Sequence, residues 1–312
     1  MRSSSDLFPV SLIAAETLEG FDDDGYLLHP GVSSDPSVRI GVSRVSSQPR
    51  DRHAPVVLLH PEFQNRYHWL KGQHLGFAGE LLAENFDVWL PEMRGHGRSP
   101  RNHTWAAGSL LTMGYEDWWS VQRFVQEQSD GQSPVWVAQG MGALSLLHAL
   151  AKKPEMANAM AALILIEPGT PDEHWLGSNL STRQRWQLRR RPAFGGPWGP
   201  ELEPSALVQE VLEWRSSRKQ PDQHPVFHRL PMSLPPVLSV SLGNDDAVRA
   251  LAAQLPGTPS DVLVPADVGA TLTAGVPACD VPIEPLRLEM RQWLARQGVS
   301  PSFSGSEAMN VL

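Results

Sequence analysis

Short, uninterrupted apolar runs recur along this chain, separated by segments long enough to form helices. The runs lie at 56–59, 86–90, 135–137, 162–166, 237–240 and 261–264. A strand that is apolar on both faces must be covered on both faces, as a parallel strand between two helix layers is. Helical patterns lie between these runs at 116–128 and 143–152, and a last one follows at 285–297. The alternation predicts an α/β fold with a doubly wound, mostly parallel sheet.

Two stretches depart from this rhythm. Residues 20–54 are rich in turn formers, and 37–45 alternate polar and apolar side chains, which is typical of antiparallel edge strands. Residues 170–235 are dense in Pro, Arg, Trp and Gly, with helical patterns at 181–190 and 205–215. We therefore expect a core formed by 1–169 and 236–297, a cap inserted at 170–235, and a flexible tail at 298–312.

The charge and composition exclude several partners. A formal charge of -8 over 312 residues gives no general electrostatic reason to bind nucleic acid or an anionic membrane. No apolar run approaches the roughly 20 residues of a transmembrane helix. The histidines lack metal-ligand spacing, and no glycine-rich phosphate loop is present, so we expect neither a metal nor a cofactor.

The compartment is predicted from two weaker features. The single cysteine, Cys279, excludes an internal disulfide and suits a reducing compartment. The apolar stretch at 7–15 is interrupted by Pro9 and Ser11 and supports a signal peptide only weakly. We therefore expect a cytoplasmic protein.

Residues 135–143, VWVAQGMGA, have the pattern of a nucleophile elbow, in which a strand, a tight small-residue turn and a helix present a reactive serine. Here Gly140 stands at the position of the nucleophile, between Gln139 and Met141. Glycine has no side-chain oxygen, so no attacking alkoxide can form at this position.

Two further motifs surround the elbow. His60 and Pro61 follow the strand at 56–59 as an HG turn would, and DVWLPEMRGHGRS at 87–99 is very similar to a DxxxxDxRGHGxS segment. In this order the elements resemble the α/β-hydrolase superfamily, and the spacing from His60 through Trp69 is similar to its acid-lipase and esterase-like branch. The resemblance covers roughly 36–169 and 230–297, whereas the cap carries no motif that can be placed.

The resemblance implies a catalytic triad, which this chain keeps only in part. In working members the elbow serine attacks a carbonyl carbon, a late histidine takes its proton, and an acid orients that histidine. By position the acid falls on Asp246 or, one residue earlier, Asp245. The histidine position falls in the turn that holds Gly269 and Ala270, and the last histidine of the chain is His228. Two of the three triad members are therefore missing.

The resemblance also implies a backbone oxyanion site, which can survive these losses. Its donors would be the amide of Met141, at a helix N-terminus, and the amide of Glu62. We expect a small acyl, ester or lipid-like ligand to bind beside them, in a pocket that loss of the serine side chain enlarges. The candidate binding residues are His60, Pro61, Glu62, His96, Gln139 and Met141. In the superfamily the positions of His60 and His96 mainly shape turns.

Three functions remain open at this point. The first is a pseudo-hydrolase that binds its ligand with little or no turnover. The second is an active hydrolase or lyase whose water is activated by Asp246, His60 or His96. The third is an interaction protein that binds an anionic headgroup, a phosphate or an acidic protein through arginines of the cap, which otherwise form a solvated helix face. These arginines are Arg183, Arg185, Arg189, Arg190 and Arg191.

Overall fold

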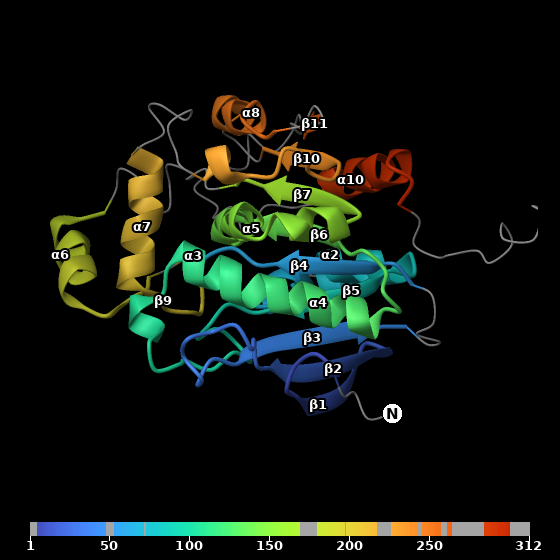
Figure 1. The fold of residues 1–312 in the computed structure, drawn as a ribbon, viewed down its shortest axis with the longest axis horizontal. Helices are drawn as coiled ribbons and strands as arrows, with labels where there is room; N and C mark the ends of the chain where they lie inside the picture. Colours follow the sequence, from blue (N-terminus) through green and yellow to red (C-terminus); the bar gives the residue numbers. More distant parts are fainter. Residues whose placement is uncertain are drawn as a thin grey trace, which may run out of the picture.

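The computed structural model describes residues 5–47, 53–71, 73–168, 180–196, 198–216, 226–241, 245–256, 261–263 and 284–299. Within these ranges one large sheet runs through the molecule and helices cover both of its faces (Figure 1). The predicted doubly wound, mostly parallel α/β fold is confirmed.

The sheet has the strand order β1-β2-β3-β5-β4-β6-β7-β10-β11. Strands β4, β5, β6, β7, β10 and β11 pair in parallel, and β1, β2 and β3 extend the β5 edge with antiparallel pairs. The bounds are β1 Val10–Leu18, β2 Phe21–Leu28, β3 Ile40–Ser46, β4 Pro55–Leu59, β5 Asp87–Pro91, β6 Val135–Gln139, β7 Ala162–Ile166, β10 Val237–Val240 and β11 Asp261–Leu263. The apolar runs thus coincide with strands to within two residues.

Successive side chains of these buried strands point to opposite faces of the sheet and pack into two separate cores. Val57 and Leu59 of β4 pack in the core that contains α4 and α5, whereas Val56 and Leu58 pack in the core with α2 and α10. Each fully buried side chain of this kind contributes about 1.5–3 kcal/mol relative to an exposed one. The helices are α1 Tyr67–Leu70, α2 Gly76–Ala83, α3 Leu110–Thr112, α4 Trp119–Gln128, α5 Gly140–Lys152, α8 Asp245–Ala252 and α10 Glu284–Arg296.

The helix predicted at 116–128 begins earlier and is irregular. Its first part is α3, its middle is a π-helix at Met113–Trp118, and only its last part is the regular α4. Gly114 in the π-helix lies so close to α5 that a Cβ there would overlap the carbonyl oxygen of Ser145. Close helix packing therefore accompanies the irregular turn.

The N-terminal edge differs from its prediction in one respect. Antiparallel strands are predicted from residue 20 onward, and β2 and β3 confirm them. A further strand, β1, takes up most of the apolar stretch at 7–15 and forms the sheet edge. Its side chains are mostly exposed, Leu12 and Ile13 among them, which is why its pattern does not resemble that of the buried strands.

Between β7 and β10 the chain leaves the sheet and builds an insert, which we define as α6 Thr182–Arg190, β8 Ala193–Phe194, β9 Glu203–Pro204 and α7 Ser205–Ser216. In Figure 1 this insert lies at one end of the molecule, with α7 between α6 and the sheet. The domain boundaries given above stay predictions, and most of the 298–312 tail lies outside the described residues. Among the helices described here, none is long and apolar enough to cross a membrane.

Candidate functional site

The elbow has the geometry that its sequence predicts. Strand β6 ends at Gln139 and α5 begins at Gly140, whose φ is 55°. This left-handed backbone is accessible to glycine and strained for any side chain. Gly142 is also required, because a Cβ there would lie 2.6 Å from the carbonyl oxygen of His60. The two glycines thus keep a sharp turn tightly against β4.

The space beside Gly140 is occupied by the carboxylate of Glu62. Its Oε2 accepts a hydrogen bond of 2.7 Å from the amide of Met141. A Cβ at position 140 would overlap that same oxygen and come within 3.2 Å of the Pro61 Cβ. The sequence predicts that the backbone amide of Glu62 contributes to the site and that the pocket beside Gly140 is enlarged. In the structure, the side chain of Glu62 instead fills that space and binds the Met141 amide. The physical reason is that unpaired amides at a helix N-terminus attract a carboxylate.

Sheet topology brings Glu62 and Gly140 together. Strands β4 and β6 are parallel neighbours, with Leu59 opposite Ala138. The chain leaves β4 toward β5 on one side and leaves β6 toward β7 on the other. Ligands of open α/β sheets bind at such a switch point, beyond the carboxyl ends of the strands.

His60 is a structural residue of the turn. It is fully buried; its Nδ1 lies 2.8 Å from the Pro61 carbonyl oxygen, and its Nε2 accepts the Met93 amide at 3.1 Å. Both ring nitrogens are therefore in use, with the proton on Nδ1. Burial, together with the neighbouring His96, holds the pKa of His60 well below its usual range. A neutral imidazole whose lone pair already accepts a hydrogen bond is poorly placed to act as a general base.

His96 forms a buried pair with Glu203 of β9. The His96 Nε2 lies 3.4 Å from Glu203 Oε2 and 3.3 Å from the Leu202 carbonyl oxygen. Burial alone would lower the pKa of His96, but Glu203, helped by Glu201 and the Leu202 carbonyl, outweighs it and the pKa is raised. The other oxygen of Glu203 accepts the Phe63 amide at 2.8 Å. Glu203, which has no sequence motif to mark it, thus joins the insert to both loops around the elbow.

The turn that carries Glu62 is held by further contacts to the insert. Phe63 has a φ of 58°, which is unusual for a residue with a side chain. Its ring stacks on Trp198 at 5.4 Å, and its carbonyl accepts the Glu201 amide at 3.1 Å. Glu201 also accepts a hydrogen bond from Asn65 at 2.7 Å. A strained residue persists where its surroundings fix it in this way.

A second residue without a sequence signal supports Gln139. The Nε2 of His68, in α1, lies 2.7 Å from Gln139 Oε1. Gln139 directly precedes Gly140, so this bond orients the side chain at the entrance to the elbow.

The RGHG segment is ordered by a buried acid. Glu92 accepts the amides of Arg66 at 3.0 Å and Arg98 at 2.7 Å. Burial raises the pKa of Glu92. A Cβ at Gly97, whose φ is 48°, would overlap this carboxylate. The segment thus fixes loop geometry around the site.

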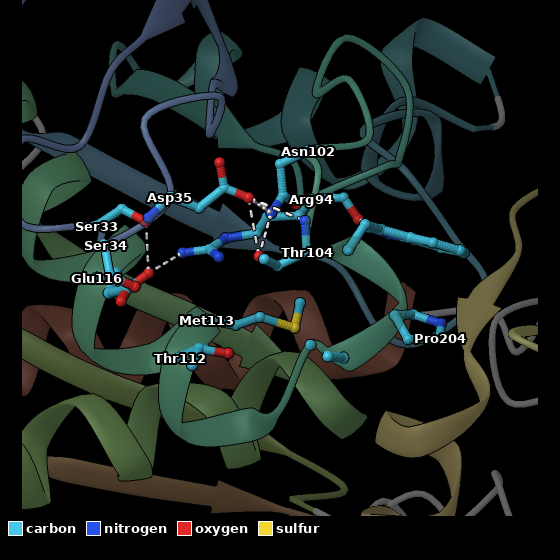
Figure 2. A pocket seen from close by; sticks show the side chains of 13 residues that line it. Ser33, Ser34, Asp35, Arg94, Asn102, Thr104, Thr112, Met113, Glu116 and Pro204 are labelled. Atoms are coloured by element: carbon cyan, nitrogen blue, oxygen red, sulfur yellow. Dashed lines mark hydrogen bonds and ion pairs between the residues drawn. The ribbon is translucent and has the colours of Figure 1, made fainter.

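A separate polar cavity of about 50 Å³ lies beside Arg94 (Figure 2). Figure 2 shows Glu116 between Ser33 and Arg94, with hydrogen bonds to both. Arg94 also pairs with Asp117 at 2.7 Å, and burial raises the pKa of Asp117 to about 6. The carboxylates neutralise the guanidinium, so this cavity is no anion site, although it has room for a few water molecules.

Comparison with known proteins identifies the family. The model of the alpha/beta hydrolase family matches residues 56–300, well over half of the chain. The chain belongs to the alpha/beta hydrolase family. No curated protein matches its sequence.

Solved structures similar to this hydrolase-family chain include three esterase-type proteins. A cold-adapted esterase from an Arctic intertidal metagenomic library has a TM-score of 0.56 and 11% identity, covering 92% of this chain and 99% of its own. A thermophilic esterase from Thermogutta terrifontis has a TM-score of 0.53 and 17% identity, with coverage of 85% and 96%. Est1E from Butyrivibrio proteoclasticus has a TM-score of 0.56 and 14% identity, with coverage of 84% and 97%. At these identities the likeness establishes the shared fold.

The family's acid and histidine positions are only partly within the structure. Asp245 and Asp246 begin α8, directly after β10, at the carboxyl edge of the sheet. Their side chains, and all of Gly269 and Ala270, lie outside the described residues. The assignment of these four positions stays a prediction. Within the described ranges, no three His, Cys, Asp or Glu side chains converge as a metal site would require.

Proposed function

We propose that this member of the alpha/beta hydrolase family is a pseudo-hydrolase, which binds a small acyl, ester or lipid-like ligand with little or no cleavage through an acyl-enzyme. The observation that carries the proposal is the Glu62 carboxylate bound to the Met141 amide beside Gly140. Two requirements of acyl transfer are therefore unmet at the elbow. The nucleophile is absent, and the amide expected to stabilise the oxyanion already binds Glu62.

The electrostatics of the site reinforce this proposal. Acyl transfer develops a negative charge on the carbonyl oxygen, which working enzymes stabilise with preorganised donors. Loss of one such donor slows a serine hydrolase by about 10²–10³. Here the donor faces a carboxylate, so a second negative oxygen beside it would also be repelled by Glu62.

The ligand class is proposed from the family's relatives. Est1E, which shares this fold, is solved with ferulic acid bound. A carbonyl or carboxylate of such a ligand can reach the Met141 amide only after Glu62 has moved away. We therefore propose a ligand whose binding does not depend on this amide. The single cysteine is the reason that we also propose a cytoplasmic location.

Fluorophosphonate labelling tests the lack of a nucleophile. The purified protein is incubated with a fluorophosphonate probe beside an active serine esterase, and adducts are located by peptide mass spectrometry. We expect labelling of the esterase alone. A specific adduct on any nucleophilic side chain of this protein, formed at a rate comparable to that of the esterase, would overturn the proposal.

A second candidate function follows from the same carboxylate. Glu62 brings an oxygen to the place where a nucleophile's side chain begins, where it could take a proton from a water that attacks an ester. This water-activating hydrolase predicts measurable p-nitrophenyl butyrate hydrolysis that Glu62→Gln abolishes. A rate that is unchanged in Glu62→Gln, or absent in the wild type, would reject it.

A further inference from the structure

The outermost helix of the insert, α6, is anchored by a single buried side chain. A capping box between Ser181 and Gln184 closes its N-terminus. Leu188 is its one buried residue, and the Leu188 carbonyl accepts a hydrogen bond of 3.1 Å from Gln209 of α7. Everything else on α6 is at least partly exposed.

Opposite Leu188, α6 presents a ridge of two arginines and a tryptophan. With about 3.6 residues per turn, positions 183, 186 and 190 lie on the side facing away from position 188. We call Arg183, Trp186 and Arg190 the arginine ridge; all three side chains are exposed, and Trp186 is 58% exposed. A large aromatic ring is thus held in solvent between two cations.

The charge that α6 itself carries is of one sign. Five arginines lie within 183–191, and no acidic residue occurs from 180 to 200. Among the residues that the structure describes, none of these arginines pairs with a carboxylate, and only Arg185 has a side-chain hydrogen bond, to the Leu180 carbonyl oxygen. The chain as a whole carries a charge of -8, so the positive charge of α6 is a local feature.

A hollow adjoins the C-terminal end of α6. Its volume is about 420 Å³, and Arg189 and Arg191 line it together with Leu188 and Pro192. Glu210 and Glu213 of α7 form its opposite side. Glu210 already accepts the Leu110 amide at 2.8 Å, so the arginines form the side of this hollow that suits a phosphate group.

We infer that α6 docks this protein on an anionic phospholipid bilayer. Arginines attract the phosphate-rich surface, and tryptophan favours the boundary between headgroups and acyl chains. Figure 1 places α6 at the extreme end of the molecule, so the ridge can meet a flat surface without obstruction from the sheet. The inference is independent of whether the site at Gly140 is catalytic.

Vesicle flotation tests this surface. The full chain is mixed at 0.1 M salt with vesicles of phosphatidylcholine alone or with 30 mol% phosphatidylserine. We expect binding to the anionic vesicles only, weakened at 0.5 M salt because the Debye length shortens. Each arginine near such a surface contributes about 1 kcal/mol, roughly fivefold in partitioning. The double variant Arg183→Gln with Arg190→Gln should therefore bind about thirtyfold more weakly.

A matched control uses two exposed arginines on α8 and α10. Arg249→Gln with Arg296→Gln removes the same charge and should change partitioning less than about twofold, since a screened charge acts within roughly 10 Å. Circular dichroism verifies that both variants are folded. Equal losses in the two variants, or no binding of the wild type, would overturn the inference. So would binding to soluble polyglutamate without binding to vesicles, which would point to an acidic protein.

Discussion

The Glu62 carboxylate accepts a hydrogen bond from the Met141 amide and fills the space in which a side chain at position 140 would begin. The two residues follow different strands, β4 and β6, and meet where the connections of the sheet diverge. An internal anion thus occupies a place that the turn geometry makes suitable for an anion from outside.

Gly140→Ser should destabilise the protein without creating an esterase. The left-handed φ of 55° costs a side chain about 1–3 kcal/mol, and the new Cβ would also displace Glu62. Urea unfolding measures the loss of stability, and p-nitrophenyl butyrate hydrolysis measures activity. Gly131→Ser is the control, because Gly131 has a φ of 79° with open space around it. Equal losses in both variants would show that Glu62 does not crowd position 140.

Glu62→Ala should open the elbow amide to anions. Removal of the carboxylate leaves the Met141 amide unpaired, so butyrate should bind and raise the unfolding temperature. Glu62→Gln is the matched variant, since its amide oxygen can still accept the same hydrogen bond. We expect no butyrate effect in Glu62→Gln or in the wild type. Stabilisation of all three proteins by butyrate would contradict an occupied elbow.

Stability should depend on pH through the pair of His96 and Glu203. Because folding raises the pKa of His96, its contribution is fully present below the unfolded pKa of about 6.5 and is lost as pH rises through the higher folded value. Glu203→Gln removes the strongest of the attractions that raise it. Chemical unfolding from pH 6 to 9 should therefore give a difference in stability between wild type and Glu203→Gln that shrinks toward high pH. A difference that is constant with pH would exclude a charged His96.

Gly142→Ala should loosen the contact between α5 and β4. The added Cβ would come within 2.6 Å of the His60 carbonyl oxygen, and overpacking of this kind costs about 1–3 kcal/mol. Gly31→Ala serves as the control, since nothing lies within 4 Å of its Cβ position. Thermal unfolding compares the two. If Gly142→Ala is as stable as Gly31→Ala, the close approach is not required.

The parts of this fold that depend on nearby residues could be predicted from sequence. The apolar run of β4 and the small-residue turn at Gly140 each contain their own signal, because burial and backbone conformation act locally. The contacts between residues far apart in the sequence could not be predicted in this way. Glu203 reaches Phe63 from 140 positions away and His68 reaches Gln139 from 71 positions away, and both depend on how the insert and α1 fold back.

The direction of the Glu62 side chain is also a feature that nearby sequence does not determine. A glutamate after His60 and Pro61 is visible in the sequence, but whether it points to solvent or to the elbow depends on the turn. That turn is set by the left-handed Phe63 and by its stacking on Trp198 in the insert. The site is thus determined by a contact across the fold.

The overlap between position 140 and the Glu62 carboxylate also couples the two positions. A side chain at 140 and the carboxylate of Glu62 compete for one space, so a serine there would turn the carboxylate away from the Met141 amide. A serine hydroxyl at 140 and a free Met141 amide therefore both require that the Glu62 carboxylate leave the elbow.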